Sequence, residues 1–244
     1  MSAKPKNIVV IGSSGAIARA FIKRLSAENP QASIHAFSRH QELTEVPSAN
    51  VHFQSMQYED ESCLAASAKR VSAQGPIDLL LVSNGILHDS QLRPEKSLKD
   101  LSAENFQRVF AVNTILPALI AKHFLPKFNT ASPSIFAALS ARVGSISDNR
   151  LGGWYAYRAS KAALNMIIKN AAIETRRTNK QAIIVGLHPG TVDSDLSKPF
   201  QGNVPEGKLF SADYSVGQLL QVLASLRSEH SGKCFAWDGQ EILP

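Results

Sequence analysis

The sequence predicts an α/β fold, in which one doubly wound parallel sheet has helices on both faces. Short apolar runs rich in β-branched residues alternate with longer amphipathic runs along the 244 residues. The run Ile77–Val82 is almost continuously apolar, which is typical of a strand covered on both faces. A turn of small residues starting at Gly12 joins the first strand to the first helix. Repeated strand–helix units with right-handed crossovers build a parallel sheet of this kind.

In the first half of the chain, hydrophobic periodicity and end signals define each element. The expected elements are the strand Asn7–Ile11, the helix Ala16–Glu28, the strands Ser33–Phe37 and Val51–Gln54, the helix around Glu61–Ser72 and the strand Ile77–Val82. Asn29-Pro30 ends the first helix, because proline cannot continue a helix. Pro76 precedes the fourth strand.

The second half continues the alternation. The expected elements are a helix from Ser102 to about Phe124, the strand Ser134–Leu139, a helix that carries Tyr157 and Lys161 and runs to about Arg177, the strand Ala182–Leu187, a helix over about Tyr214–Arg227 and the strand Cys234–Trp237. In parallel sheets, ligands bind beyond the carboxyl ends of the strands. The motifs that predict function lie at these strand ends.

Composition indicates a single globular domain, 1–244, since 44% of the residues are hydrophobic and 19% are charged. The sequence has no run of about 18 apolar residues, so we expect no transmembrane helix. The N-terminus has no signal-peptide pattern, so we expect a cytoplasmic protein. Cys63 and Cys234 are far apart and have no partners for a metal site. The net charge of +6 is dispersed, which argues against nucleic acid but suits an anionic small ligand.

The turn Gly12-Ser13-Ser14-Gly15-Ala16-Ile17-Ala18 follows a clean strand and opens a helix. Small residues there let the backbone approach a pyrophosphate, and a helix N-terminus favours its charge. We therefore expect a dinucleotide site of the Rossmann type. The spacing fits either Gly-x-x-x-Ala-x-Ala or Gly-x-x-Gly-x-x-Ala.

The end of the second strand, Ser38-Arg39, bears on the choice of cofactor. An acidic residue at this place binds the ribose 2′-hydroxyl of NAD, whereas a basic one accommodates the 2′-phosphate of NADP. The strand end has no acid, and Arg39 offers a planar fork for a phosphate. The sequence thus favours NADP(H) over NAD(H).

Tyr157 and Lys161 lie four residues apart, so a helix places them on one face. An ammonium beside a phenol favours the phenolate, and we expect Lys161 to lower the pKa of Tyr157. A phenol tuned in this way can exchange a proton with a carbonyl oxygen. Tyr155 is two residues earlier and points to another side of the helix.

Taken together, these motifs resemble the short-chain dehydrogenase/reductase family over nearly the whole chain. The resemblance rests on the glycine turn, Asn84-Gly85, Asn113 in Ala-Val-Asn-Thr, Ser140, the Tyr157/Lys161 pair and Pro189-Gly190-Thr191-Val192. Leu87-His88-Asp89, the Ser140–Ile146 segment and Trp237-Asp238-Gly239 are similar to the C-factor and sniffer-like carbonyl reductase branch.

The resemblance implies NADPH-dependent reduction of a ketone, aldehyde or quinone, with hydride coming from the cofactor. Tyr157 is implied as general acid/base, Lys161 as its pKa partner and ribose ligand, Ser140 as donor to the substrate oxygen and Asn113 as part of a proton relay. The remaining implied cofactor contacts are Gly12, Ser14, Gly15, Ala16, Ile17, Ser38, Arg39, Gln57, Asn84, Gly85, Pro189, Gly190, Val192 and Ser194. A homodimer or homotetramer is implied as well.

The sequence departs from the family pattern in three places. The usual Asn-Asn-Ala-Gly stretch reads Val82-Ser83-Asn84-Gly85, and Gln57 stands where an aspartate usually contacts adenine. The distance from Ser140 to Gly144 is one residue longer than usual. Counting along the strand places Ser140 at the active position, whereas counting back from Gly144 places Ala141 there. We expect the strand to fix the side-chain direction, which favours Ser140.

The substrate side is expected to be apolar. Its expected lining is Leu87, His88, Val143, Ile146, Trp154 and the long segment 193–210, which we expect to act as a lid. Two other functions fit less well. One is a C-factor-like signalling protein with little turnover. The other is a nucleotide-sugar epimerase or dehydratase, for whose extra substrate domain the chain lacks the length.

Overall fold

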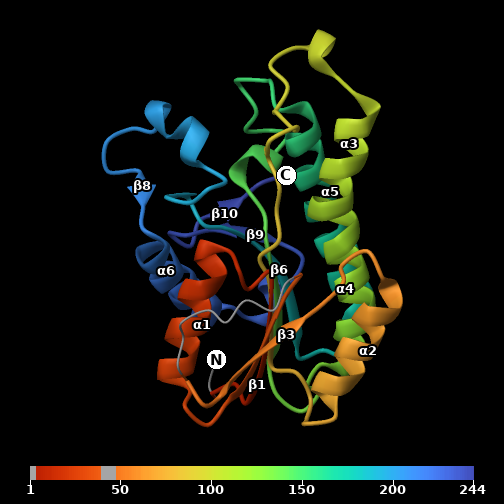
Figure 1. The fold of residues 1–244 in the computed structure, drawn as a ribbon. Coiled ribbons are helices and arrows are strands. Elements are labelled where there is room, and N and C mark those ends of the chain that lie inside the picture. The colour runs from red at the N-terminus through yellow and green to blue at the C-terminus, as the bar shows by residue number, and fades with distance from the viewer. Residues whose placement is uncertain (1–3, 40–47) are drawn as a thin grey trace.

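The computed structural model describes residues 4–39 and 48–244 and contains one eight-stranded sheet, with the order β10-β9-β6-β5-β4-β1-β2-β3 (Figure 1). The strands are β1 (Asn7–Ile11), β2 (Ser33–Ser38), β3 (Val51–Ser55), β4 (Leu79–Val82), β5 (Ser134–Leu139), β6 (Ala182–His188), β9 (Cys234–Ala236) and β10 (Glu241–Ile242). All neighbours are parallel except β10 and β9. The expected doubly wound α/β fold is confirmed, with one antiparallel edge strand that the sequence did not predict.

Helices cover the sheet on both faces (Figure 1). The helices α1 (Ala16–Glu28) and α6 (Ala212–Ser225) pack on one face, around apolar residues that include Ile8 and Val10 of β1. The helices α2 (Glu61–Ser72), α4 (Leu116–Phe124) and α5 (Tyr155–Thr175) pack on the other face, around Val9 and Ile11. This alternation along β1 is the period-2 pattern of a strand buried on both sides.

The expected long helix over 102–124 contains a π-helical turn. The chain forms α3 (Ala103–Phe110), the π-turn Ala111–Ile115 and then α4. A π-turn inserts one extra residue and is frequent at functional sites. Its buried residues are Asn113 and Thr114, so the turn directs a polar side chain into the interior.

The continuous helical run Ala103–Lys127 is long and apolar enough to cross a membrane by length and composition. Core helices of soluble proteins pass the same test. Leu116, Ile120 and Phe124 of this run pack in the core between the sheet and its neighbouring helices. We therefore describe it as a core helix.

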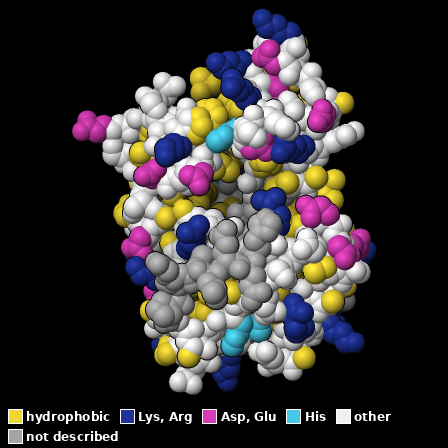
Figure 2. Space-filling model, in the orientation of Figure 1, with side chains coloured by type: hydrophobic (Ala, Val, Ile, Leu, Met, Phe, Trp, Pro, Cys, Tyr) yellow, Lys and Arg dark blue, Asp and Glu magenta, His cyan; other side chains and the backbone are white. Residues whose placement is uncertain are grey.

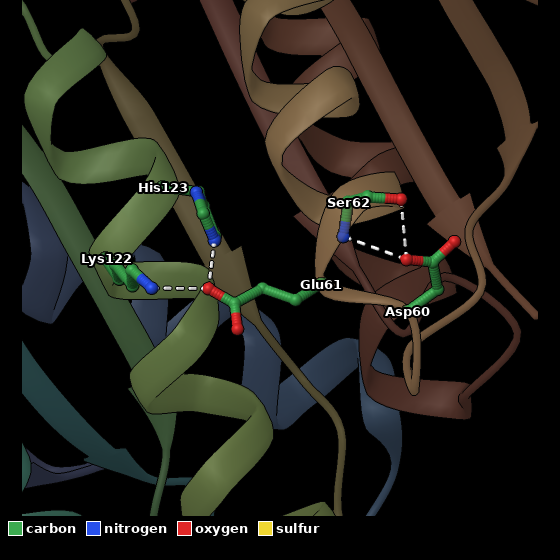
Figure 3. Close-up of polar contacts among 5 residues, drawn as sticks. All are labelled: Asp60, Glu61, Ser62, Lys122 and His123. Carbon is green, nitrogen blue, oxygen red and sulfur yellow. Dashed lines mark hydrogen bonds and ion pairs between the residues drawn. The ribbon is translucent and has the colours of Figure 1, made fainter.

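Polar contacts attach α2 to α4 (Figure 3). Asp60 caps α2, since its carboxylate accepts the Ser62 backbone N–H at 2.9 Å. Glu61 Oε1 accepts hydrogen bonds from Lys122 Nζ at 2.5 Å and from His123 Nε2 at 2.9 Å, and both donors lie at the end of α4. The start of one helix is thus held against the end of another on the same face of the sheet.

The segment between β6 and α6 starts and ends in a small sheet of its own. There β7 (Thr191–Val192) pairs in parallel with β8 (Leu209–Phe210). Between them lies the short 3₁₀ segment Lys198–Asn203. The β7–β8 pairing joins the two ends of this long connection, which lies beyond the carboxyl ends of the strands (Figure 1).

Candidate active site

The glycine turn after β1 packs so closely on the loop after β4 that it admits no side chain at Gly12. Gly12 has φ +86°, and a Cβ added there would lie 2.8 Å from Ser83 Oγ and 3.0 Å from the Asn84 backbone N. Ser83 Oγ donates to the Ile11 backbone O at 2.8 Å, so serine holds β4 to the turn where the family pattern has asparagine. Gly15 is the residue before α1, and Ser14, Ala16 and Ile17 lie beside it at the helix start.

Tyr58 also holds this turn, and the sequence analysis did not identify it. Its hydroxyl accepts the Gly12 backbone N–H at 3.1 Å and donates to the Phe37 backbone O at 3.2 Å. Burial raises the pKa of Tyr58, and hydrogen bonds with Asn84 and Gly12 oppose the shift. No local pattern marks this residue, because its partners are far away in sequence.

The ends of β2 and β3 lie side by side at the same edge of the sheet. Ser38 is buried as the last residue of β2, and Arg39 follows it with an exposed side chain. Gln57 is exposed just beyond β3. The positive charge of Arg39 acts on Tyr58, where it opposes the rise in pKa that burial causes. A cation and an amide are therefore available near the glycine turn.

Asn113 joins the loop after β4 to α5. It is fully buried; its Oδ1 accepts the Ile86 backbone N–H at 2.8 Å, and its Nδ2 donates to the Ile86 backbone O at 2.9 Å and to Ser160 Oγ at 3.1 Å. A Cβ added at Gly85 would lie 3.7 Å from Lys161 Nζ and 3.8 Å from Asn113 Oδ1. The π-turn, the β4 loop and Lys161 thus meet at one point.

Tyr157 and Lys161 are both buried on the inward side of α5, as their spacing predicts, whereas Tyr155 is only half-buried. Lys161 Nζ donates to the Leu139 backbone O at 2.8 Å and lies 5.8 Å from the centre of the Tyr157 ring. Burial raises the pKa of Tyr157 to about 12 and lowers the pKa of Lys161 to about 8. Burial is the cause of the raised pKa of Tyr157, so the structure contradicts our expectation that Lys161 lowers it.

Ser140 lies at the end of β5, but its hydroxyl points to α5. Its Oγ donates to Asn165 Oδ1 at 2.7 Å. Phe136 and Ala138, at alternate positions of β5, belong to the core on the α5 side of the sheet, and Ser140 continues their direction. Ser140 also lies beside the Cys234 thiol, whose pKa burial raises to about 12 and whose hydrogen bond with Ser140 opposes that shift.

Ala141, and not Ser140, belongs to the apolar cluster that contains Tyr157. The structure thus corrects our expectation that Ser140 occupies the active position, and it agrees with the count back from Gly144. The reason is the close contact of Gly144 with α5. A Cβ there would lie 2.9 Å from the Lys161 backbone C, so this contact fixes the loop that turns Ala141 toward Tyr157.

The end of β6 turns sharply at Gly190, which has φ +77°. A Cβ added there would lie 2.6 Å from the Phe210 ring. The Pro189 backbone O accepts a hydrogen bond from Ser215 Oγ at 2.7 Å, and this bond attaches the turn to α6. Val192 is buried, and Ser194 Oγ donates to the Val192 backbone O at 3.2 Å. These residues lie together beyond the carboxyl end of the strand.

An apolar cluster surrounds Tyr157. Its other members are Leu87, Ala141, Val143, Trp154, Leu196 and Phe200. Trp154 and Phe200 have ring centres 4.9 Å apart. Hydrophobic side chains also gather in the upper half of the face in Figure 2. Of the expected substrate-side residues, Leu87, Val143 and Trp154 belong to this cluster, whereas His88 does not and Ile146 is 77% exposed.

His88 attaches the 193–210 segment to the loop after β4. Its Nε2 lies 3.1 Å from the backbone O of Asp195 and 3.1 Å from that of Leu196. Carbonyl oxygens only accept, so this nitrogen carries the proton. The His88 ring also packs edge-on against Phe200, with the centres 5.5 Å apart.

These residues fit a nicotinamide dinucleotide. The Gly12 turn packs bare backbone against Ser83 and Asn84 at the start of α1, and Arg39 supplies a cation at the end of β2. Asn84 Oδ1 is buried, and no hydrogen bond satisfies it within the protein. Gly85 lies next to Lys161 Nζ, since a Cβ added there would be 3.7 Å from that atom. Over 4–39 and 48–244, no group of three or more His, Cys, Asp or Glu residues could hold a metal ion.

Comparisons with known proteins agree with this geometry. A family model described as short chain dehydrogenase matches residues 6–204. C-signal of Myxococcus xanthus is 33% identical over 168 residues, which cover 69% of this chain and 93% of that protein. The crystal structure of NADPH-bound carbonyl reductase from chicken fatty liver superposes with a TM-score of 0.86 at 26% identity, covering 99% of this chain and all of the other. Carbonyl reductase Sniffer of D. melanogaster has the same fold, with a TM-score of 0.84 at 21% identity over 98% of this chain and all of the other.

Proposed function

The chain belongs to the short-chain dehydrogenase/reductase family of oxidoreductases, and from this premise we propose that it reduces a hydrophobic carbonyl compound to an alcohol with NADPH. The observation that carries the proposal is the placement of Tyr157. Its phenol is buried next to Lys161, within an apolar cluster, at the edge of the sheet where the Gly12 turn lies.

The cofactor would be held by the residues at the strand ends. The Gly12 turn and the start of α1 suit the pyrophosphate, Arg39 and Ser38 the 2′-phosphate, and Gln57 the adenine. Asn84, Gly85 and Lys161 would hold the nicotinamide ribose, and the residues that follow β6 would hold the nicotinamide. These last residues are Pro189, Gly190, Val192 and Ser194. The bound cofactor supplies the hydride.

Tyr157 supplies the proton. With a pKa raised to about 12, the phenol is protonated at neutral pH, which is the form that donates to a carbonyl oxygen. Lys161, with its pKa lowered to about 8, keeps a positive charge at neutral pH. That charge stabilises the phenolate as the proton leaves. Asn113 positions Lys161 and the β4 loop relative to each other.

The substrate enters under the 193–210 segment, which acts as a lid. Leu196 and Phe200 of this segment belong to the cluster at Tyr157, so the segment must move to admit a substrate. The cluster offers mainly aliphatic and aromatic contacts. This favours a hydrophobic ketone, aldehyde or quinone over a charged substrate.

The test of the proton donor is Tyr157→Phe, which removes one oxygen and keeps the ring. NADPH oxidation with a panel of ketones and quinones, followed by the absorbance of the reduced nicotinamide, should fall by about two to four orders of magnitude. The matched control is Tyr155→Phe, which should be mild because Tyr155 is outside the cluster. Substantial turnover in Tyr157→Phe, with loss in the control, would refute the assignment.

The test of cofactor choice is Arg39→Ala. Loss of a charge-assisted phosphate contact should raise the NADPH dissociation constant about tenfold or more, while NADH binding should barely change. Titrations of both cofactors by nicotinamide fluorescence measure this. Equal affinity of the unchanged protein for NADPH and NADH would show that the end of β2 does not select the 2′-phosphate.

A second candidate function is that of a dinucleotide-binding signalling protein with little turnover. It is supported by the 33% identity to the protein named C-signal. NADPH binding without oxidation across the whole substrate panel would favour it. We further propose a cytoplasmic location and a homodimer or homotetramer as the assembled form. Sedimentation of the purified protein tests the assembly.

A further inference from the structure

A buried carboxylate, that of Glu95, lies at the start of α5. Glu95 belongs to the irregular segment between β4 and α3, and only 3% of it is exposed. Its Oε2 accepts the Ala156 backbone N–H at 3.2 Å, and its backbone O accepts the Trp154 backbone N–H at 2.5 Å. These two donors precede Tyr157 directly, so Glu95 binds the chain at the point where it enters the helix of the proposed proton donor.

The helix α5 lacks the usual groups at its start. Trp154, the residue before the helix, makes no capping hydrogen bond with its side chain, and the first turn of α5 contains no acidic residue. The first N–H groups of a helix need hydrogen-bond acceptors. Glu95 provides such an acceptor from a segment about 60 residues earlier in the chain.

The backbone that enters α5 is held in a conformation that is unfavourable for an L-residue. Gly152 and Gly153 have φ of +64° and +65°, and Trp154 has φ +51°. Trp154 is the one non-glycine residue with positive φ in the part of the chain that the structure describes. Such a residue persists only where its surroundings fix it. Here the hydrogen bond to the Glu95 backbone O fixes it.

This conformation brings Trp154 against the proposed reacting group. Its ring packs nearly perpendicular to the Tyr157 ring, with the centres 6.2 Å apart, and its other contact is with Phe200. If the first turn of α5 shifted, the phenol and one wall of the apolar cluster would move together.

The second oxygen of Glu95 argues for a functional role. Oε1 is buried and accepts no hydrogen bond. A buried carboxylate oxygen without a partner costs stability, so folding alone does not favour a glutamate at this place. The hydrogen bond at the start of α5 gives a reason for a glutamate at this position, whereas stability gives none.

We propose that Glu95 is a positioning residue for Tyr157. It accepts the Ala156 N–H and thereby fixes the first turn of α5, which sets the places of the Tyr157 hydroxyl and the Trp154 ring. The effect is one of hydrogen-bond geometry and not of charge. The proposal rests on the proposed function of Tyr157.

The test compares Glu95→Ala, Glu95→Gln and Glu95→Asp with Asp60→Ala, which removes a helix-capping carboxylate far from the cluster. Glu95→Ala should lower kcat for carbonyl reduction about tenfold or more, with the NADPH dissociation constant changed less than about twofold. Glu95→Gln keeps an oxygen acceptor and should stay within about threefold of the unchanged protein. Asp60→Ala should lower Tm by about 2–4 °C and leave kcat unchanged.

A readout without turnover separates this proposal from the proposed function. The chain has two tryptophans, so in a Trp237→Phe background the fluorescence reports Trp154 alone. Glu95→Ala should increase acrylamide quenching of Trp154, and Glu95→Gln should not. Absence of turnover in the unchanged protein, combined with this quenching pattern, would refute the proposed function and leave the local positioning intact.

Three results would overturn the proposal. The first is normal kcat and normal quenching in Glu95→Ala. The second is an equal loss in Glu95→Gln and Glu95→Ala, which would assign the effect to charge. The third is an equal loss of kcat in Asp60→Ala. If Glu95→Ala does not fold, Glu95→Asp decides, since its shorter side chain cannot reach Ala156 without a shift and should lower kcat.

Discussion

Two neighbouring side chains at the end of β5 point in different directions, and this decides the chemistry near Tyr157. Ser140 donates to Asn165 under α5, whereas Ala141 belongs to the apolar cluster around Tyr157. Sequence alone placed a hydroxyl beside Tyr157 because the family resemblance includes a serine near this position. The structure places a methyl group there, so Tyr157 is the polar group that the cluster presents.

We predict opposite outcomes for substitutions at these two positions. Ser140→Ala removes a hydrogen bond in the core and should lower the free energy of unfolding by about 1 kcal/mol, with kcat changed less than about threefold. Ala141→Ser adds a donor near the developing oxyanion and should raise kcat, by up to about tenfold. Urea unfolding and steady-state kinetics measure both. A hundredfold loss of kcat in Ser140→Ala would restore Ser140 to the active site.

At the scale of elements, the most regular segments could be predicted from the sequence. The bounds of β1, α1, α2 and β5 agree to the residue, because clear periodicity is combined with local end signals such as Asn29-Pro30. The π-turn Ala111–Ile115 could not be predicted, since one extra residue hardly changes the helical pattern. β10 was also missed, because two residues are too few to show a period.

The long connection after β6 is held at its two ends by strand pairing, and His88 binds the carbonyls of Asp195 and Leu196 just after β7. This combination explains how a segment can close over Tyr157 and still open. The paired strands keep the ends in place, while a few side-chain contacts hold the part between them. Opening then requires loss of the His88 hydrogen bonds and of the Phe200 contacts, with no change in the sheet.

We predict that His88→Ala loosens this segment. Without the donor to the Asp195 and Leu196 carbonyls, amide hydrogen exchange over residues 193–204 should become faster by about fivefold or more, as expected for loss of about 1 kcal/mol of local stability. The substrate KM should rise, and NADPH affinity should stay the same because His88 is outside the glycine turn. His52→Ala, which alters an exposed residue on β3, is the control. Unchanged exchange in His88→Ala would show that the His88 hydrogen bonds contribute nothing to the stability of this segment.

At the scale of the whole molecule, the strand order brings distant motifs to one edge. β1, β4, β5 and β6 are neighbours in the sheet, so the residues after them converge although they span positions 12 to 194. This convergence follows from the α/β pattern and could be predicted. The non-local partners Tyr58 and Glu95 could not, because each acts on a segment far away in sequence and leaves no local pattern.

Buried histidines make the stability of the whole molecule depend on pH. Burial lowers the pKa of His35 to about 4, and the neighbouring His52 adds to this shift; burial also lowers the pKa of His188 to about 4. As pH falls below 6.5, the unfolded chain binds a proton at each position before the folded protein does. The free energy of unfolding should therefore fall between pH 6.5 and 4, by up to about 1.4 kcal/mol per pH unit for each histidine.

The last prediction isolates the contribution of His35. Surface carboxylates with a lowered pKa, such as Asp60 and Glu61, lose their contribution below about pH 4.5, so the interval from pH 6 to 5 belongs mainly to the histidines. In that interval, His35→Gln should reduce the slope of unfolding free energy against pH by up to about 1.4 kcal/mol per unit, measured by urea unfolding. His52→Gln removes a neighbouring positive charge, so the pKa of His35 should rise and the slope should shrink by a smaller amount. A His35→Gln curve parallel to that of the unchanged protein would show that His35 titrates alike in the folded and unfolded states.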